Sequence, residues 1–159
     1  MRVGLVGWRG MVGSVLMQRM IAEEDFKDVS PVFFSTSQVG QAVTMGDGRE
    51  VVLKDANDRD QLSEMDAIIS CQGGSYTKKM HAPLRALGWQ GYWIDAASTL
   101  RMAPNSVIVL DPINGSDINT AIGEGKKDFI GGNCTTSLMM LAMHGLFRDE
   151  LVEWVSAMT

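Results

Sequence analysis

The segment VGLVGWRGMVG, residues 3–13, decides the fold of this chain. Its first five residues predict a buried β-strand that ends at Gly7, and apolar positions that recur every four residues from Val12 to Met20 predict a helix. Between the two lies a GxxGxxG turn, whose glycines permit a tight bend and the close approach of a pyrophosphate to the backbone. This βα unit predicts dinucleotide binding, although similar glycine-rich turns also occur with nothing bound.

The rest of the chain alternates strand-like and helix-like segments. Strands are predicted at residues 29–34, 67–71, 92–96 and 107–110, with a hairpin across residues 46–48. Helices are predicted at residues 75–87, near 115–127 and at 135–147, and residues 129–130 lead into a pair of glycines. This alternation predicts a Rossmann-like α/β fold, with a doubly wound, mostly parallel sheet and ligands at the carboxyl ends of its strands.

The last residues look unlike the end of a domain. Residues 152–158 resemble the first strand of a further element, and no polar tail follows them. We therefore expect the 159 residues to be the first part of a longer protein.

Composition excludes several classes of protein. With 45% hydrophobic residues the chain can form an ordinary globular core, and 19 acidic against 14 basic residues argue against a nucleic-acid partner. No apolar run approaches the roughly 18 residues of a membrane span, and the first residues lack the basic-then-apolar pattern of a signal peptide, so a cytoplasmic protein without a membrane partner is expected. Two cysteines outside any CxxC or His/Cys cluster predict reduced thiols and no metal site.

The end of the second predicted strand bears on the choice of cofactor. NAD-binding proteins usually carry an acidic residue there, whereas this strand ends in Ser35, Thr36 and Ser37. Hydroxyl groups suit a 2′-phosphate, and Arg9 in the glycine turn offers a cation, so these residues favour NADP(H) over NAD. A serine-threonine cluster is also typical of an ordinary turn. Gln72, which follows a predicted strand, either contacts the cofactor or simply starts a helix.

Cys134 is the candidate nucleophile. It lies in GGNCTT, directly before an apolar helical run, so it is expected at a helix N-terminus with Asn133 as the cap. The helix dipole and free N–H groups stabilise a thiolate there, and the two glycines let a carbonyl group approach the sulfur. A buried cysteine at a helix start is the alternative. Cys71 ends an apolar strand, where we expect a buried and inert thiol.

Three further residues bear on catalysis. Arg101 follows a predicted strand and offers a planar fork to a phosphate or carboxylate, or else it is a solvated surface charge. His81 and His144 each lie inside a predicted helix, and His144 is about 15 Å along the helix from the cysteine. Neither histidine is expected to act as the base for the thiol.

Five motifs occur in order along the chain, namely GWRGMVG at residues 7–13, FFSTS at 33–37, CQGG at 71–74, STLR at 98–101 and GGNCT at 131–135. Together they closely resemble the aspartate-β-semialdehyde dehydrogenases of the Gram-negative bacterial type, and the resemblance covers essentially the whole chain. It implies NADP-dependent interconversion of aspartyl phosphate and aspartate-β-semialdehyde plus phosphate, a step toward lysine, methionine and threonine. It also implies a homodimer for the full-length protein.

The resemblance assigns roles to individual residues. Cys134 corresponds to the nucleophile that forms an acyl thioester, and Arg101 and Asn133 correspond to groups that bind substrate or phosphate. The residues that correspond to cofactor contacts are Gly7, Arg9, Gly10, Met11, Val12, Thr36, Ser37 and Gln72. Residues 1–132 are expected to form the NADP-binding domain and residues 133–159 the beginning of a catalytic and dimerisation domain. Family members are longer and carry their catalytic histidine beyond Thr159, so little or no turnover is expected from these residues alone.

Two other interpretations remain open. One is a related enzyme that also joins a nucleotide domain to a cysteine nucleophile, such as N-acetyl-glutamyl-phosphate reductase or glyceraldehyde-3-phosphate dehydrogenase. The other is a stand-alone nucleotide-binding or redox-sensing domain that uses Cys134 as a regulatory thiol.

Overall fold

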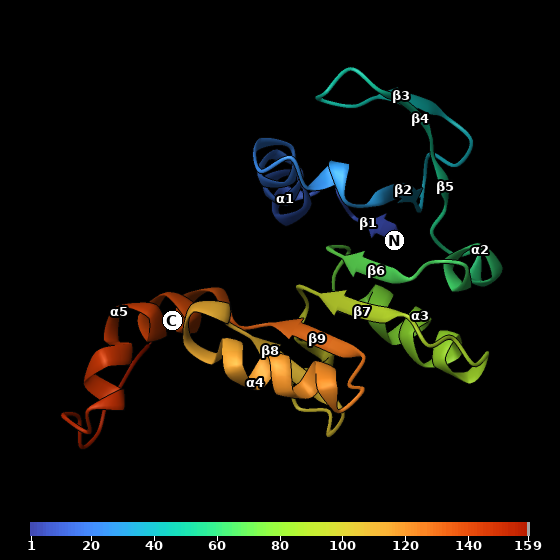
Figure 1. Cartoon of the computed structure of the whole chain (residues 1–159). Coiled ribbons are helices and arrows are strands. Elements are labelled where there is room, and N and C mark those ends of the chain that lie inside the picture. The colour runs from blue at the N-terminus through green and yellow to red at the C-terminus, as the bar shows by residue number, and fades with distance from the viewer. Residues whose placement is uncertain (159) are drawn as a thin grey trace.

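A seven-stranded sheet forms the centre of the molecule in the computed structural model, which describes residues 1–158 (Figure 1). All pairings in it are parallel. In spatial order its strands are β5 (Lys54–Asp55), β2 (Ser30–Ser35), β1 (Arg2–Val6), β6 (Ala67–Ser70), β7 (Tyr92–Asp95), β9 (Asp128–Gly131) and β8 (Ser106–Val109). A separate antiparallel hairpin joins β3 (Ala42–Thr44) to β4 (Glu50–Val52). The predicted Rossmann-like parallel sheet is therefore confirmed.

The described chain forms helices α1 (Met11–Ala22), α2 (Arg59–Ser63), α3 (Gly74–Ala86), α4 (Asp111–Gly123) and α5 (Cys134–Arg148), with short 3₁₀ turns η1 (Asp25–Lys27) and η2 (Ser98–Leu100). Helix α1 packs on one face of the sheet and α3 on the other. Side chains along β1 alternate between faces, so Val3 and Leu5 pack with α1 whereas Val6 packs with α3. Burying both faces requires this continuous apolar strand.

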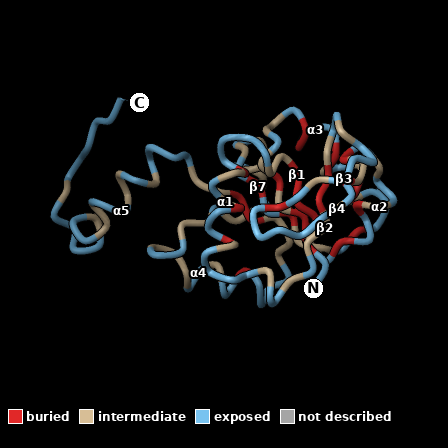
Figure 2. The backbone as a smooth tube through the Cα atoms, turned by 90° about the horizontal axis from the view of Figure 1, so that it is seen from above, coloured by how far each residue is buried: buried red, intermediate tan, exposed pale blue. Residues whose placement is uncertain are grey.

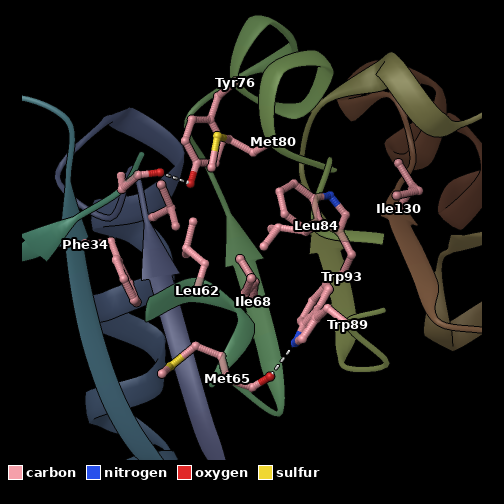
Figure 3. Packing of buried hydrophobic residues seen from close by; sticks show 12 residues of the cluster. Phe34, Leu62, Met65, Ile68, Tyr76, Met80, Leu84, Trp89, Trp93 and Ile130 are labelled. Atoms are coloured by element: carbon pink, nitrogen blue, oxygen red, sulfur yellow. Dashed lines mark hydrogen bonds between the residues drawn. The ribbon is translucent and has the colours of Figure 1, made fainter. Parts of the chain in front are cut away.

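The core beneath α3 is rich in large side chains (Figure 3). Trp93, Ile68 and Leu84 are each fully buried in it. Two polar side-chain atoms in this core find backbone partners: the Tyr76 hydroxyl donates to the Ala56 carbonyl at 2.7 Å, and the Trp89 indole N–H donates to the Met65 carbonyl at 2.7 Å. The packing between α3 and the sheet is thereby fixed without an unpaired polar group at either ring.

The order of the strands reverses beside β1. From β1 the chain passes through α1 to β2 on one side, and from β6 it passes through α3 to β7 on the other. In open α/β sheets, ligands bind where the order reverses, outside the carboxyl ends of the strands. The turn after β1 and the loop after β6 therefore border the expected ligand site.

Several details differ from the sequence-based expectation. The strand expected within residues 152–158 is absent, and the backbone is irregular over these residues. No neighbouring strand of the described chain pairs with this segment, and its large apolar side chains are exposed. Helix α4 begins at Asp111, four residues before the expected start.

The carboxyl-terminal part of the described chain projects from the body. Figure 2 shows α5 and the following segment as a mostly exposed arm beside the buried sheet, and no residue of α5 is buried. Nowhere in residues 1–158 is a helix long and apolar enough to cross a bilayer.

Candidate nucleotide cavity and thiol site

The turn after β1 packs directly against the loop after β6. Gly7 has a φ of +73°, and a Cβ atom there would lie 2.5 Å from the Gln72 nitrogen. A Cβ atom on Gly13 would lie 2.3 Å from the Gly7 carbonyl oxygen. Both positions therefore require glycine, one for its backbone conformation and both for close backbone approach.

A cavity of about 490 Å³ opens beside this turn. It is lined by Gly7, Trp8, Arg9, Gly10, Phe34, Ser35, Thr36, Ser37, Gln38, Cys71 and Gln72. Six of the eight predicted cofactor residues line it, whereas Met11 and Val12 lie at the first turn of α1 with exposed side chains. Ser35 also lines the cavity, as part of the hydroxyl cluster that favours NADP(H). Trp8, Phe34, Gln38 and the cavity position of Cys71 were not predicted from the sequence, and of these only Trp8 lies inside the glycine turn.

The cavity fits a phosphorylated ligand in its chemistry. Among residues 1–158, Arg9 is the one charged side chain that lines it, and the first turn of α1 contains no acidic residue. Gly10 caps α1 without a side-chain hydrogen bond, so the first N–H groups of the helix are available to an anion. The Ser35 hydroxyl accepts the N–H groups of Ser37 and Gln38 at 3.3 and 3.1 Å and thereby shapes the hydroxyl-rich loop.

Cys71 occupies a different position from the one expected. It follows β6 in the loop at the cavity, and its side chain is half-buried. Burial, together with the charge of the Asp95 carboxylate, raises the pKa of the Cys71 thiol. A thiol with a raised pKa is a poor nucleophile near neutral pH, so the structure gives Cys71 no catalytic environment.

Cys134 is exposed at the first position of α5. The Asn133 side chain caps this helix by accepting the Thr136 N–H at 3.0 Å, as the sequence predicts. The alternative of a buried helix-start cysteine is therefore wrong. Just before the cap, a Cβ atom on Gly132 would lie 2.5 Å from the Ser137 hydroxyl, so this glycine allows the turn to pack closely on the helix.

Arg101 holds the turn that leads to Cys134. Its Nε donates to the Gly131 carbonyl at 2.8 Å and one terminal nitrogen donates to the Gly132 carbonyl at 3.2 Å. The half-buried guanidinium is thus no free surface charge, and its other terminal nitrogen makes no hydrogen bond within residues 1–158. The alternative of a solvated arginine is wrong.

The turns after three neighbouring strands meet at one edge of the sheet. Arg101, after β7, bonds the turn after β9, and the Thr99 hydroxyl donates to the Gly74 carbonyl at 3.3 Å, after β6. Because β1 and β6 pair in parallel, Gly7 and Gln72 belong to the same edge. Hydrogen bonds and backbone packing therefore connect the nucleotide cavity to the cysteine.

Neither histidine serves the thiol within residues 1–158. His81 makes a 2.9 Å contact through Nε2 with the Asp128 carboxylate, at the start of β9, whereas Cys134 follows the end of that strand. His144 makes no hydrogen bond to Cys134 in the described part of the chain. Among the same residues, no three His, Cys, Asp or Glu side chains gather as a metal site.

Comparisons with known proteins identify the family of this chain. Residues 2–121 match the family described as semialdehyde dehydrogenase, NAD binding domain. The aspartate semialdehyde dehydrogenase of Francisella tularensis is 60% identical over 97% of this chain and 42% of its own, with a TM-score of 0.93. Two more distant structures share the fold: aspartate semialdehyde dehydrogenase II of Vibrio cholerae, complexed with ASA, and the Candida albicans enzyme with NADP.

The Vibrio structure is 20% identical, with a TM-score of 0.73 over 92% of this chain and 46% of its own. The Candida structure is 13% identical, with a TM-score of 0.66 over 93% of this chain and 47% of its own. The chain thus spans less than half the length of each of these three solved structures.

Proposed function

Because the chain belongs to the semialdehyde dehydrogenase family, we propose that it is the nucleotide-binding part of an NADP-dependent aspartate-semialdehyde dehydrogenase. The observation that carries the proposal is the shared sheet edge, which holds a nucleotide-sized cavity and an exposed cysteine at a helix N-terminus, with Arg101 bonded to the turn before that cysteine. Cavity, thiol and arginine are the parts that reduction of an acyl phosphate requires.

NADP(H) is the proposed cofactor. The supporting features are the Arg9 guanidinium, the hydroxyl groups of Thr36 and Ser37 on the same cavity wall, and the absence of an acidic residue from that wall within residues 1–158. A structural relative from Candida albicans is described as a complex with NADP. Gly7 and Gly10 would let the pyrophosphate approach, and the backbone N–H groups of Met11 and Val12 would face it.

Cys134 is proposed to attack the carbonyl carbon of an aspartyl phosphate. The carbon–sulfur bond forms as the carbon–oxygen bond to phosphate breaks, and inorganic phosphate leaves with the bonding electron pair. When bound, the nicotinamide cofactor supplies the hydride that brings the thioester carbon to the oxidation level of an aldehyde. The thiolate of Cys134 then departs, and the semialdehyde is released.

Arg101 and Asn133 are proposed to serve the departing phosphate and the thiol. The terminal nitrogen of Arg101 that makes no hydrogen bond within residues 1–158 is a charged donor for a phosphate oxygen. Asn133 fixes the start of α5, so the thiolate lies at the positive end of the helix dipole. Both residues act on negative charge, on the leaving group in one case and on the nucleophile in the other.

The wider setting follows from the resemblance alone. We propose that the complete enzyme is a cytoplasmic homodimer that serves lysine, methionine and threonine biosynthesis, and that residues 133–159 begin its catalytic domain after a cofactor domain of residues 1–132. A nucleophilic thiol that must stay reduced agrees with a cytoplasmic location.

The test joins residues 1–159 to the remaining residues of the Francisella tularensis relative and measures NADPH formation from NADP⁺, phosphate and aspartate semialdehyde. We expect phosphate-dependent activity that Cys134→Ser abolishes. Activity with N-acetylglutamate semialdehyde instead would favour the reductase interpretation. Nucleotide binding by the 159-residue chain together with an inactive, folded fusion would favour a stand-alone binding or sensing domain.

A further inference from the structure

We propose that Trp8 sets the cofactor preference, because it holds the Arg9 guanidinium at the cavity wall where a 2′-phosphate would bind. This inference rests on the proposed use of NADP(H) and adds a positioning residue to it. Trp8 would not need to touch the phosphate. Its indole ring would act through Arg9, as the surface on which that side chain is stacked.

Arg9 has one defined contact for its charged group. The guanidinium carbon lies 4.6 Å from the centroid of the Trp8 ring. Arg9 is exposed, and within residues 1–158 its side chain makes neither an ion pair nor a hydrogen bond. An arginine held only by water loses side-chain rotamer entropy when a ligand orders it. Stacking on Trp8 removes part of that loss before the ligand arrives.

Stacking leaves the hydrogen-bonding edge of Arg9 free. A planar guanidinium interacts with an aromatic ring through its face, whereas its N–H groups point outward around its edge. A phosphate accepts hydrogen bonds from that edge, often two at once. The contact with Trp8 therefore orients Arg9 without using the donors that an anion needs.

Trp8 is itself anchored to β2. Its indole N–H donates to the Phe34 carbonyl at 3.2 Å, and its ring meets the edge of Phe33 with the centroids 5.1 Å apart. Strand β2 runs directly into Thr36 and Ser37, the hydroxyl residues of the cavity. Trp8 thus links the glycine turn to the end of β2. The Arg9 guanidinium and the hydroxyl groups of Thr36 and Ser37 are thereby held in a fixed arrangement on one wall of the cavity.

The neighbouring cation is already occupied. Lys79 lines a second cavity, which shares Thr36 and Gln72 with the first. Its ammonium group donates to the Asn57 side-chain carbonyl at 2.6 Å. Arg9 is therefore the cation that is oriented toward a ligand and not toward a protein acceptor, and Lys79 is a matched control.

The experiment compares two probes that differ only in the 2′-phosphate, namely 2′,5′-ADP and 5′-AMP. Calorimetry measures their dissociation constants for the 159-residue chain and its variants. We expect Trp8→Leu to weaken 2′,5′-ADP binding roughly 5- to 20-fold, the range of a partly desolvated cation–π contact. Binding of 5′-AMP should change by less than about twofold. Trp8→Phe, which keeps a ring but loses the bond to Phe34, should be intermediate.

A double variant tests whether Trp8 acts through Arg9. In an Arg9→Gln background, Trp8→Leu should cause no further loss of 2′,5′-ADP affinity. Lys79→Gln should leave the affinity for both probes unchanged. Equal weakening of both probes by Trp8→Leu, a loss that persists without Arg9, or a larger loss from Lys79→Gln would each overturn the inference. If Trp8→Leu unfolds the chain, Trp8→Phe and the Arg9 cycle built on it decide.

The two proposals fail in different ways. If the unaltered chain binds 2′,5′-ADP no better than 5′-AMP, the proposed cofactor is wrong. If the unaltered chain prefers 2′,5′-ADP and Trp8→Leu and Trp8→Phe keep that preference, the cofactor proposal stands and the role of Trp8 is refuted.

Discussion

The two cysteines of this chain lie in opposite chemical environments. Cys134 is exposed at a helix N-terminus, whereas the pKa of the half-buried Cys71 is raised by burial and by Asp95. A raised thiol pKa means a smaller thiolate fraction at pH 8, and the thiolate is the form that alkylates. We expect iodoacetamide to modify Cys134 at least about ten times faster than Cys71. Mass spectrometry of Cys71→Ser and Cys134→Ser chains gives each rate separately, and equal rates would contradict the assignment.

Gly13 is the glycine whose replacement should do the most damage. The added Cβ atom of Gly13→Ala would lie 2.3 Å from the Gly7 carbonyl oxygen and 2.5 Å from the Trp8 Cα, and backbone atoms cannot rotate away. We expect a loss of about 3 kcal/mol in the free energy of unfolding, measured by urea denaturation. Gly10→Ala is the control, since its Cβ atom meets only the Gly7 oxygen at 3.3 Å. Comparable losses in both variants would argue against the close approach.

Sequence reasoning succeeded at residues whose partners are close along the chain. Asn133 and Cys134 were placed correctly because a helix cap acts within three residues. The partners of Arg101 lie 30 and 31 residues away, and the Phe34 carbonyl lies 26 residues from Trp8. Such contacts depend on which strands become neighbours in the sheet. No local pattern of residues encodes that.

At the scale of elements, a cluster of three polar side chains, Asp128, His81 and Arg85, links α3 to the start of β9. Asp128 lies 2.9 Å from His81 and 2.6 Å from Arg85, both on α3. Burial alone would raise the pKa of Asp128, but the hydrogen bonds from His81 and Arg85 outweigh it and hold the pKa below its usual value. Asp128 therefore stabilises the fold above its unfolded pKa, near about pH 4, and this contribution is lost as the pH falls through the folded pKa.

Replacing the carboxylate should remove that pH dependence. We expect Asp128→Asn to lower the free energy of unfolding by about 2 kcal/mol at pH 7, because hydrogen bonds to a charged group are lost. The difference from the unaltered chain should shrink as the pH falls below about 4. Glu23→Gln, which breaks the exposed ion pair with Arg19 in α1, should cost less than about 1 kcal/mol. A difference in the free energy of unfolding that stays constant down to pH 3 would contradict a stabilising role for the charged Asp128 carboxylate.

Helices and strands were predictable from the sequence where they are long enough to show a repeating pattern of apolar residues. The long segments α1, α3 and α5 and the longer strands of the main sheet follow their apolar patterns closely, whereas the two-residue β5, at the edge of that sheet, and the five-residue α2 are too short to show a period. Helix α4 starts early because Pro112 lies in its first turn, where proline is favoured. Asn114 then interrupts the helical backbone and bonds the Leu110 N–H and the Ile108 carbonyl.

At the scale of the whole molecule, apolar side chains are buried in the sheet and its helices but exposed in the carboxyl-terminal part of the described chain. The sheet and the helices that cover it bury a dense core, whereas α5 and the segment after it are mostly exposed (Figure 2). Leu138 is 69% exposed and Trp154 is 80% exposed. Large exposed apolar groups that cluster usually mark a contact surface. The apolar run at residues 152–158 suggested a strand from its pattern alone. A strand forms only when a neighbour supplies hydrogen bonds, and the described chain supplies none there.

The described residues predict that the chain binds the cofactor but does not turn over substrate. Residues of the turn after β1, the end of β2 and the loop after β6 line the proposed cofactor cavity, whereas within residues 1–158 no histidine or carboxylate forms a hydrogen bond with Cys134. A thioester step that lacks a proton donor and acceptor loses the 10²- to 10⁴-fold or so that general acid–base catalysis contributes. We therefore expect the 159-residue chain to bind NADPH, seen as a change in tryptophan fluorescence, but to give no measurable phosphate-dependent NADPH formation.

Two controls make this prediction decisive. The Gly13→Ala chain should lose the fluorescence response, because the turn that receives the pyrophosphate is distorted. Cys134→Ser should keep it, since the thiol does not line the cavity. Substantial turnover by the unaltered chain that Cys134→Ser removes would contradict the prediction, because the acid–base groups would then have to come from residues 1–159. Binding without turnover would instead separate cofactor recognition, which the parallel sheet completes, from proton transfer, which needs a further group beside the thiol.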